Sequence, residues 1–160
     1  MAHDGVVIWS IAKETPDYHA TDLSGGGALA VGGRWNRKGT AAVYASTSIA
    51  LAMLETLAHL GGNLAIRNAV LVAIAVPKAQ WDQRRVASRA ALPPAWLAAP
   101  PGRASMDIGD AWLRAQAQLL LQVPSIIVPE EVNVVVNPVH PAAVELNAHI
   151  ARQHVYDPRR

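Results

Sequence analysis

The sequence predicts an α+β fold in which a mixed, partly antiparallel sheet has helices on its flanks. Three observations support this prediction. Short apolar and β-branched runs recur along the chain, capped helical segments lie between some of them, and strands and helices do not alternate regularly. The chain has 160 residues, 51% of them hydrophobic, which is enough for one buried core. No internal repeat or second core is visible, so we expect a single domain over 1–160.

The first half of the chain is predicted to contain two strands and a helix. Residues 6–12 (VVIWSIA) are apolar and partly β-branched, as strands usually are, and 41–45 (AAVYA) form a second short strand. The polar and glycine-rich segment 13–40 is predicted to be a loop, and loops of this length inside a compact domain are usually functional. The sequence STS then offers N-cap residues for a helix over 49–60.

The second half is predicted to contain regular elements separated by prolines. Residues 77–105 are irregular, because their LPPAWLAAPPG sequence excludes a helix or a central strand. The elements that we expect are a buried strand over 68–77, a helix over 108–123 ended by Pro124, strands over 125–129 and 133–138, and a last helix over 142–154.

The composition excludes several classes of site. The chain has no cysteine, and its six histidines lack metal-ligand spacing, so we expect neither thiolate chemistry nor a metal. The N-terminus lacks the features of a signal peptide, and no apolar run reaches the roughly 20 residues of a membrane span, which favours a cytoplasmic protein without membrane contact. Eleven of the fourteen cations are arginine, and they are scattered rather than striped, so direct nucleic-acid binding is not expected.

The segment 32–39, with the sequence GGRWNRKG, is a candidate anion-binding loop. Gly32 and Gly33 allow close approach of the backbone to a ligand. Arg34 offers a fork of donors for phosphate, and Trp35 gives a flat wall for a guanidinium or a ring. The alternative is an ordinary surface loop with a solvated arginine. Neither the dinucleotide-binding glycine pattern nor a P-loop is present.

Glu55 lies on the predicted helix in the same stripe as three apolar residues. Leu51, Leu54 and Ala58 are spaced three and four apart, and Glu55 follows Leu51 by four residues. A carboxylate there lies either at the rim of the core or in a pocket, because burying it without a partner is costly. The alternative, which is the commoner one for an isolated glutamate, is a boundary residue that reaches solvent and pairs with His59.

Two further residues carry little information on their own. Tyr44 ends the second predicted strand near the start of the Glu55 helix, and most such tyrosines are half-buried sheet residues. Ser125 follows Pro124 at a junction of two elements, without the glycine-flanked elbow of a hydrolase nucleophile.

Together these segments resemble the RES-domain toxins of bacterial toxin–antitoxin pairs, a family named for an arginine, a glutamate and a serine. The resemblance is carried by residues 32–60, GGRWNRKGTAAVYASTSIALAMLETLAHL, and by residues 123–142, VPSIIVPEEVNVVVNPVHPA. Both stretches are in the order and spacing of the family, and the resemblance covers nearly the whole chain. The three named residues are matched by Arg34, Glu55 and Ser125.

The resemblance implies a fold similar to ADP-ribosyltransferase toxins and a reaction that breaks the nicotinamide–ribose bond of NAD⁺ without a metal. It implies catalytic roles for Glu55, Arg34 and Tyr44. In this reaction Glu55 stabilises positive charge on the ribose, and Arg34 binds the pyrophosphate. The residues expected to bind NAD⁺ are Ser125, Trp35, Asn36, Arg37, Ser46 and Asn137.

The acceptor of the ADP-ribose stays open among water, inorganic phosphate and a side chain of a host protein. No second acid lies beside Glu55 in the sequence, which slightly favours water or phosphate. The resemblance also implies a partner, a helix-turn-helix antitoxin that covers the pocket and supplies any DNA contact.

The first strand departs from the family pattern. Family members often carry an arginine after the strand tryptophan, whereas here Ser10 follows Trp9. The departure shifts phosphate binding onto Arg34 and Arg37. It also leaves a second alternative, a weakly active toxin that acts mainly as a binding partner in an autorepressing toxin–antitoxin complex.

Overall fold

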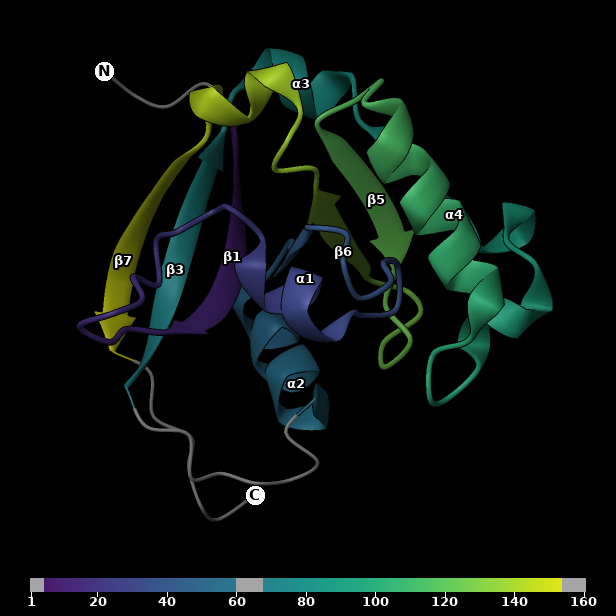
Figure 1. Ribbon diagram of the computed structural model, residues 1–160, viewed down its shortest axis with the longest axis horizontal. Helices are drawn as coiled ribbons and strands as arrows, with labels where there is room; N and C mark the ends of the chain where they lie inside the picture. Colours follow the sequence, from purple (N-terminus) through teal and green to yellow (C-terminus); the bar gives the residue numbers. More distant parts are fainter. Residues whose placement is uncertain (1–4, 60–67, 154–160) are drawn as a thin grey trace.

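A seven-stranded sheet forms the framework of the computed structural model, which describes residues 5–59 and 68–153 (Figure 1). The spatial order of the strands is β4-β5-β6-β2-β1-β3-β7. The strands are β1 (Val6–Lys13), β2 (Val43–Ser46), β3 (Ala69–Val76), β4 (Arg85–Val86), β5 (Leu120–Pro124), β6 (Val132–Val136) and β7 (Asn147–Gln153).

Helices flank this sheet, which confirms the predicted α+β class. Within the described residues, four are α-helices: α1 (Gly26–Val31), α2 (Ile49–His59), α3 (Lys78–Asp82) and α4 (Arg103–Ala115). The same part of the chain contains three short 3₁₀ helices: η1 (Arg89–Ala91), η2 (Pro94–Leu97) and η3 (Pro141–Glu145). In Figure 1, α4 lies along β5 on one side of the molecule, and α2 lies below the middle of the sheet.

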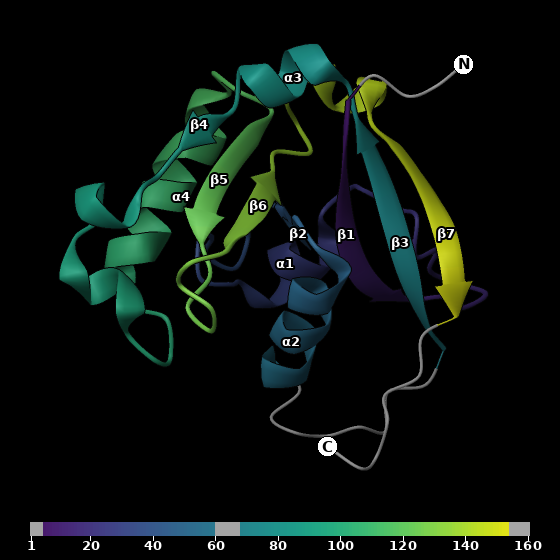
Figure 2. The same cartoon turned by 180° about the vertical axis from the view of Figure 1, so that it is seen from behind.

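The sheet has two halves that meet at β1 and β2. Strands β1, β3 and β7 lie on one side, and β4, β5 and β6 lie on the other, as the view from behind also shows (Figure 2). Strand β1 pairs with β2 only at Trp9 and Ser46, whereas it pairs with β3 along its whole length. Among the described strands, only β4 and β5 run parallel. Because a single residue pair joins β1 to β2, the two halves of the sheet are connected by far fewer backbone contacts than β1 and β3 are.

Two clusters of buried side chains hold these elements together. The first joins both halves of the sheet, since it contains Ile8 and Ile74 as well as Leu120. The second lies on the other face of β5 and includes Leu121 and three tryptophans. Consecutive residues of a strand point to opposite faces, which is why the two leucines belong to different clusters.

The predicted strands over 6–12, 41–45, 68–77 and 133–138 correspond to β1, β2, β3 and β6, and the helix over 49–60 corresponds to α2. The predicted helix over 108–123 is wrong in its second half. Helix α4 ends at Ala115, and its C-cap residue Gln116 adopts a left-handed conformation with φ 52°. Leu120 and Leu121 pair with β6 and are fully buried, so sheet pairing overrides the local helix preference of leucine.

The predicted strand over 125–129 is also wrong. Residues 125–131 form a turn, because Ser125 Oγ accepts hydrogen bonds from the backbone N–H groups of Ile127 and Val128. These bonds close a serine turn that competes with strand pairing. The strand that we expected here lies just before it, as β5.

The last predicted helix, over 142–154, is replaced by the short η3 and by strand β7. His140 Nδ1 accepts the N–H of Ala142 and caps η3, which ends at Glu145. The following residues pair with β3 along its open edge. The alanine-rich composition favours a helix, but hydrogen bonding to the sheet decides the conformation.

The long segment 13–40 contains one regular element, α1, that the sequence does not predict. Its residues are mostly small, and none of them is buried. In the part of the chain that the structure describes, no helix has both the length and the apolar character needed to span a membrane.

Candidate active site around Glu55

Helix α2 positions Glu55. Ser48 begins the helix, since its Oγ accepts the N–H of Leu51 at 3.1 Å. Leu51 and Ala52 are the buried residues of the helix, whereas Leu54 is 43% exposed. Ala58 is exposed as well, so the predicted apolar stripe is wrong at Leu54 and Ala58, and the side chain of Glu55 is held by polar groups of the neighbouring elements.

The carboxylate of Glu55 receives two short hydrogen bonds on the same oxygen. Ser125 Oγ donates to Oε1 at 2.7 Å, and Asn133 Nδ2 donates to Oε1 at 2.6 Å. Hydrogen bonds to a carboxylate are stronger than those between neutral groups. The sequence alternative, a solvent-facing Glu55 paired with His59, is not what the structure contains.

Ser125 is fixed in this position by the turn that follows β5. It is fully buried, and its N–H donates to Glu131 O at 3.0 Å. Its Oγ accepts from Ile127 N at 3.1 Å and from Val128 N at 3.0 Å while it donates to Glu55. All the hydrogen-bonding capacity of the hydroxyl is therefore used, and its direction is set.

Ser46 belongs to the same group of side chains. It pairs with Asn133 in the β2–β6 register, so both residues point to the same face of the sheet. Ser46 is 3% exposed, and its Oγ donates to Asn133 Oδ1 at 2.7 Å. The structure thus links Ser46, Asn133, Glu55 and Ser125 by a continuous series of hydrogen bonds.

Arg34 lies near Glu55 and is anchored to the segment around η2. Its Nη1 donates to Trp96 O at 2.7 Å and to Ala98 O at 2.9 Å. Burial lowers the pKa of Arg34, and the negative charge of Glu55 partly offsets this effect. The two residues therefore lie in one electrostatic environment.

Tyr44 connects residues 32–39, here called the arginine loop, to the sheet. Its hydroxyl donates to Asn36 Oδ1 at 2.7 Å and accepts the N–H of Trp35 at 3.0 Å. Burial raises the pKa of Tyr44, so the hydroxyl stays protonated. A Cβ at Gly33 would lie 2.8 Å from this hydroxyl, which explains the glycine at that position.

Trp35 and Asn36 hold the loop together. Trp35 is 2% exposed and stacks on Trp96 with 6.2 Å between ring centroids, so it is a core residue and not an open wall. Asn36 is fully buried, and its Nδ2 donates to backbone oxygens of Ala28, Arg37 and Thr40. Both side chains are used in contacts that hold the loop in place, and the loop in turn positions Arg34.

Arg37 and Asn137 are bound to α4. The guanidinium of Arg37 forms ion pairs with Asp110 at 2.9 Å and Asp107 at 2.6 Å, and hydrogen bonds to Asp107 and then Asp110 raise the pKa of Arg37. Asn137 is fully buried and donates to Leu113 O at 2.9 Å. Neither side chain joins the hydrogen-bonded group around Glu55.

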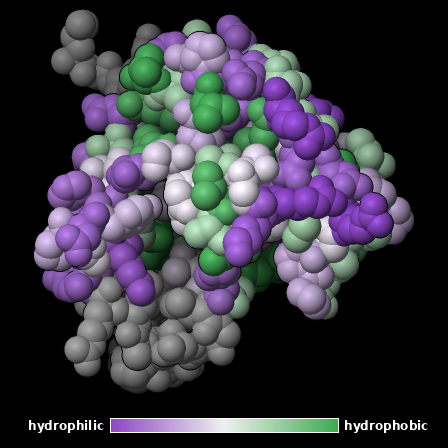
Figure 3. All heavy atoms as spheres, viewed as in Figure 1, coloured by the Kyte–Doolittle hydropathy of each residue, from purple (hydrophilic) through white to green (hydrophobic). Residues whose placement is uncertain are grey.

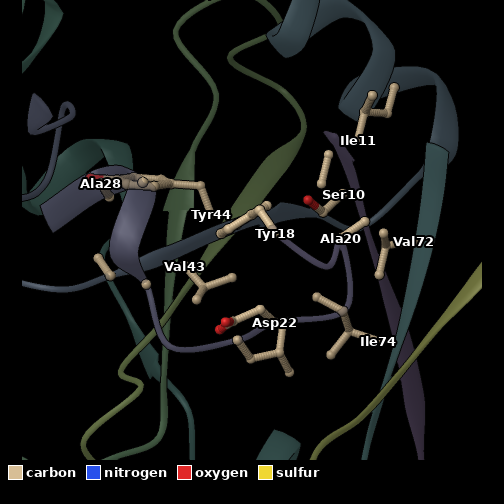
Figure 4. Close-up of a pocket in the computed structure, with 15 residues that line it drawn as sticks. Ser10, Ile11, Tyr18, Ala20, Asp22, Ala28, Val43, Tyr44, Val72 and Ile74 are labelled. Carbon is tan, nitrogen blue, oxygen red and sulfur yellow. The ribbon is translucent and has the colours of Figure 1, made fainter. Parts of the chain in front are cut away.

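A pocket of about 260 Å³ lies between strands β1, β2 and β3 and the segment 18–28 that follows β1 (Figure 4). Its polar lining includes Ser10, Tyr18, Asp22 and Tyr44. None of the described residues that line it is a lysine or an arginine. Ser24 donates to the carboxylate of Asp22 and lowers the pKa of that group. The pocket shares Tyr44 with the arginine loop.

The face of the molecule seen in Figure 1 is of mixed character. It shows a small central group of apolar residues between hydrophilic regions (Figure 3). Leu29 and Val31 of α1 are exposed, at 44% and 72%. No group of three or more potential metal ligands occurs within residues 5–59 and 68–153.

The fold and the grouping of Arg34, Glu55 and Ser125 define a toxin of the RES class. The chain belongs to the RES domain family, whose domain matches residues 7–157. This membership confirms the resemblance on which the site residues were predicted.

The relatives of the chain are toxins. It is 47% identical over 152 residues to the Prs ADP-ribosylating toxin of Sphingobium sp. (strain YBL2), which covers 95% of this chain and 94% of that protein. It is 40% identical over 121 residues to Toxin Res of Photorhabdus laumondii subsp. laumondii, with 76% of each chain covered. The crystal structure of the M. tuberculosis MbcT–MbcA toxin–antitoxin complex contains a similar fold, with a TM-score of 0.61 and 17% identity over 92% of this chain and 84% of that one.

Sequence reasoning missed one member of the site, Asn133. It is a polar residue in an otherwise apolar strand, VNVVV. Such a residue needs a partner when it faces the protein, and this isolated polarity is the pattern that could have drawn attention to it.

Proposed function

We propose that this chain is an NAD⁺-consuming toxin that breaks the bond between nicotinamide and ribose. The observation that carries the proposal is the carboxylate of Glu55, held on one oxygen by Ser125 and Asn133 and placed in the electrostatic environment of Arg34. A fixed carboxylate next to a cation is suited to a substrate that combines an anionic pyrophosphate with a ribose that becomes positively charged.

The chemistry requires charge stabilisation more than proton transfer. When the C1′–N bond of NAD⁺ breaks, its electron pair neutralises the pyridinium, so nicotinamide leaves as a neutral molecule. The ribose then carries oxocarbenium-like positive charge, as in glycoside hydrolysis. Among the described residues, no group donates to Glu55 Oε2, which leaves this oxygen for the ribose hydroxyls and the developing charge.

Arg34 and Tyr44 have separate roles in this proposal. Arg34 presents the remaining nitrogens of its guanidinium to the pyrophosphate while Nη1 stays bound to the η2 segment. Tyr44 lines the 260 Å³ pocket with its ring, which provides a face for nicotinamide. Trp35, Asn36 and Arg37 support the loop, and we assign them no direct contact with NAD⁺.

We propose a protein side chain as the acceptor of ADP-ribose. The support is the 47% identity to a relative named as an ADP-ribosylating toxin, and the Prs of that name is the first target to test. The nucleophile of the acceptor forms a bond to C1′ and releases its proton to solvent. Water or phosphate remains the second candidate, because no second carboxylate of the described residues forms a hydrogen bond with Glu55.

We also propose an antitoxin partner, of the helix-turn-helix type, that covers the site. The support is the similar fold of the toxin in the MbcT–MbcA toxin–antitoxin complex. The alternative is a toxin with little enzymatic activity that acts mainly through this complex. Measuring NAD⁺ loss and ADP-ribose transfer distinguishes the two.

The test compares the wild-type chain, freed of antitoxin, with Glu55→Ala. NAD⁺ loss and transfer of labelled ADP-ribose are followed with Prs, with inorganic phosphate, and with neither. We expect labelling of Prs that depends on Glu55, and an unchanged rate in Glu145→Ala, an exposed control at the end of η3 and away from the site. Loss of NAD⁺ without Prs labelling would select water or phosphate as acceptor. An inert wild-type chain in all three conditions would refute the enzymatic proposal.

A further inference from the structure

We propose that Asn133 is a positioning residue that orients the carboxylate of Glu55 for catalysis. This inference depends on the proposed function, because it assigns Asn133 a task in the same reaction. The contact that carries it is the 2.6 Å hydrogen bond from Asn133 Nδ2 to Glu55 Oε1.

The orientation of the Asn133 amide follows from its two neighbours. On one side Ser46 Oγ donates to Asn133 Oδ1 at 2.7 Å, and on the other side Nδ2 faces Glu55. Rotating the amide by 180° would place Oδ1 against a carboxylate oxygen, and two acceptors without a proton between them repel. The carboxylate therefore selects one orientation, and the hydroxyl of Ser46 adapts to it and holds it.

The position of Asn133 is set by the sheet. It pairs with Ser46 on β2 and with Val123 on β5, so strands on both sides fix its backbone. Ser125, the other donor, lies in the turn just after β5. Glu55 thus accepts one hydrogen bond from a residue of strand β6 and one from a residue of the turn after β5. Side chains on strands and helices keep a catalytic group in position more precisely than side chains on loops do.

The two donors make the oxygens of Glu55 unequal. Both Ser125 and Asn133 donate to Oε1, and no donor among the described residues reaches Oε2. This arrangement fixes the rotation of the carboxylate and directs Oε2 to the substrate. Ground-state binding of NAD⁺ through Arg34 does not require this rotation to be fixed, so Asn133 acts mainly on the rate of bond cleavage.

The decisive experiment compares Asn133→Asp with Asn133→Ala. Aspartate has nearly the same shape as asparagine, so a packing role predicts that it is the milder change. A positioning role predicts the reverse, because a carboxylate at this place repels Glu55 and turns it away. We expect kcat to fall about 10- to 100-fold in Asn133→Ala and further in Asn133→Asp, with KM for NAD⁺ changed less than about 3-fold.

Asn147→Asp serves as the matched control, since this asparagine is exposed at the start of β7. It should leave kcat and KM unchanged. If Asn133→Asp is as active as the wild type, or if it raises KM and spares kcat, the positioning role is refuted.

A stability measurement tests the same contact without relying on activity. Asn133→Asp should lower the melting temperature, and adding Glu55→Gln should restore much of the loss, because the new amide can donate to the aspartate. Strictly additive effects of the two changes would refute the contact. An inactive wild-type chain would refute the proposed function, whereas this double-mutant cycle would still decide whether Asn133 holds Glu55.

Discussion

Ser125 donates a hydrogen bond of 2.7 Å to Glu55, although 70 residues separate the two in the chain. The bond joins the end of β5 to the side of α2, and so unites two distant stretches of sequence in one site. Strands β2 and β6 are neighbours in the sheet, which brings the turn after β5 close to the helix after β2. The site therefore exists only when the β2–β6–β5 part of the sheet is formed.

Replacing Ser125 by alanine should damage both activity and stability. The change removes one of the two donors to Glu55 found among the described residues, and it leaves the N–H groups of Ile127 and Val128 without their acceptor. We expect kcat to fall about 10- to 100-fold and the free energy of unfolding to fall by about 1–3 kcal/mol. Steady-state NAD⁺ cleavage and urea unfolding measure the two effects.

The control for this prediction is Ser88→Ala. Ser88 is exposed and its side chain caps nothing at the start of η1, so both quantities should stay at the wild-type value. A Ser125→Ala chain with wild-type kcat would contradict a role of this hydroxyl in the reaction.

Tyr44→Phe should destabilise the arginine loop. The lost hydroxyl is the donor to the buried Asn36 and the acceptor for the N–H of Trp35, so two groups lose a partner. Leaving such groups unsatisfied costs about 1–3 kcal/mol of unfolding free energy. Tyr18→Phe, at a tyrosine that is 41% exposed, should change the same quantity by less than about 0.5 kcal/mol. Equal effects of the two substitutions would contradict the assigned contacts.

Tyr44 should also make the stability depend on alkaline pH. Burial raises its pKa above the ordinary value of 10.0, so the unfolded chain loses this proton at lower pH than the folded chain. The stabilisation is fully present below about pH 10 and is lost as the pH rises toward the folded-state pKa. Unfolding free energies from pH 8 to 11 should fall less steeply in Tyr44→Phe than in the wild type. Parallel curves would contradict the shift.

The resemblance to the RES family singled out Arg34, Glu55 and Ser125 as site residues. In the structure Ser125 donates a hydrogen bond to Glu55, and the charge of Glu55 acts on Arg34. The resemblance also implied that Trp35 and Asn36 bind NAD⁺, but adjacent residues of a loop face different directions. Their side chains are buried in contacts of the loop itself, and sequence alone does not fix that direction.

Errors in the predicted elements fall where local preference and sheet pairing disagree. The segment Asn147–Gln153 reads as a helix from its own residues, yet it becomes the edge strand β7 because β3 offers an unpaired edge. Leu120 and Leu121 follow the same rule in β5. Asn133 was missed for a related reason, since its partners Ser46 and Glu55 are distant in the chain.

Gly109→Ala should destabilise the packing of α4 more than an ordinary glycine substitution. A Cβ at Gly109 would lie 1.7 Å from the carbonyl oxygen of Trp35, so the helix and the arginine loop would have to separate. Overpacking of this kind costs about 1–3 kcal/mol or more of unfolding free energy. Gly27→Ala is the matched control, because a Cβ there meets no atom within 4 Å and alanine favours its helix. Thermal unfolding should show a loss only in Gly109→Ala, and equal melting temperatures would contradict the close packing.

Arg34→Lys separates binding of the pyrophosphate from anchoring of the η2 segment. The guanidinium bonds to the carbonyl oxygens of Trp96 and Ala98 through Nη1 and still has other donors to offer, whereas a lysine has one point charge for both tasks. We expect KM for NAD⁺ to rise about 10-fold with a smaller change in kcat, which corresponds to about 1.4 kcal/mol of binding. Arg89→Lys, at an exposed arginine, should leave KM unchanged. If Arg34→Lys lowers the melting temperature but leaves KM at the wild-type value, Arg34 anchors the segment and does not bind the pyrophosphate.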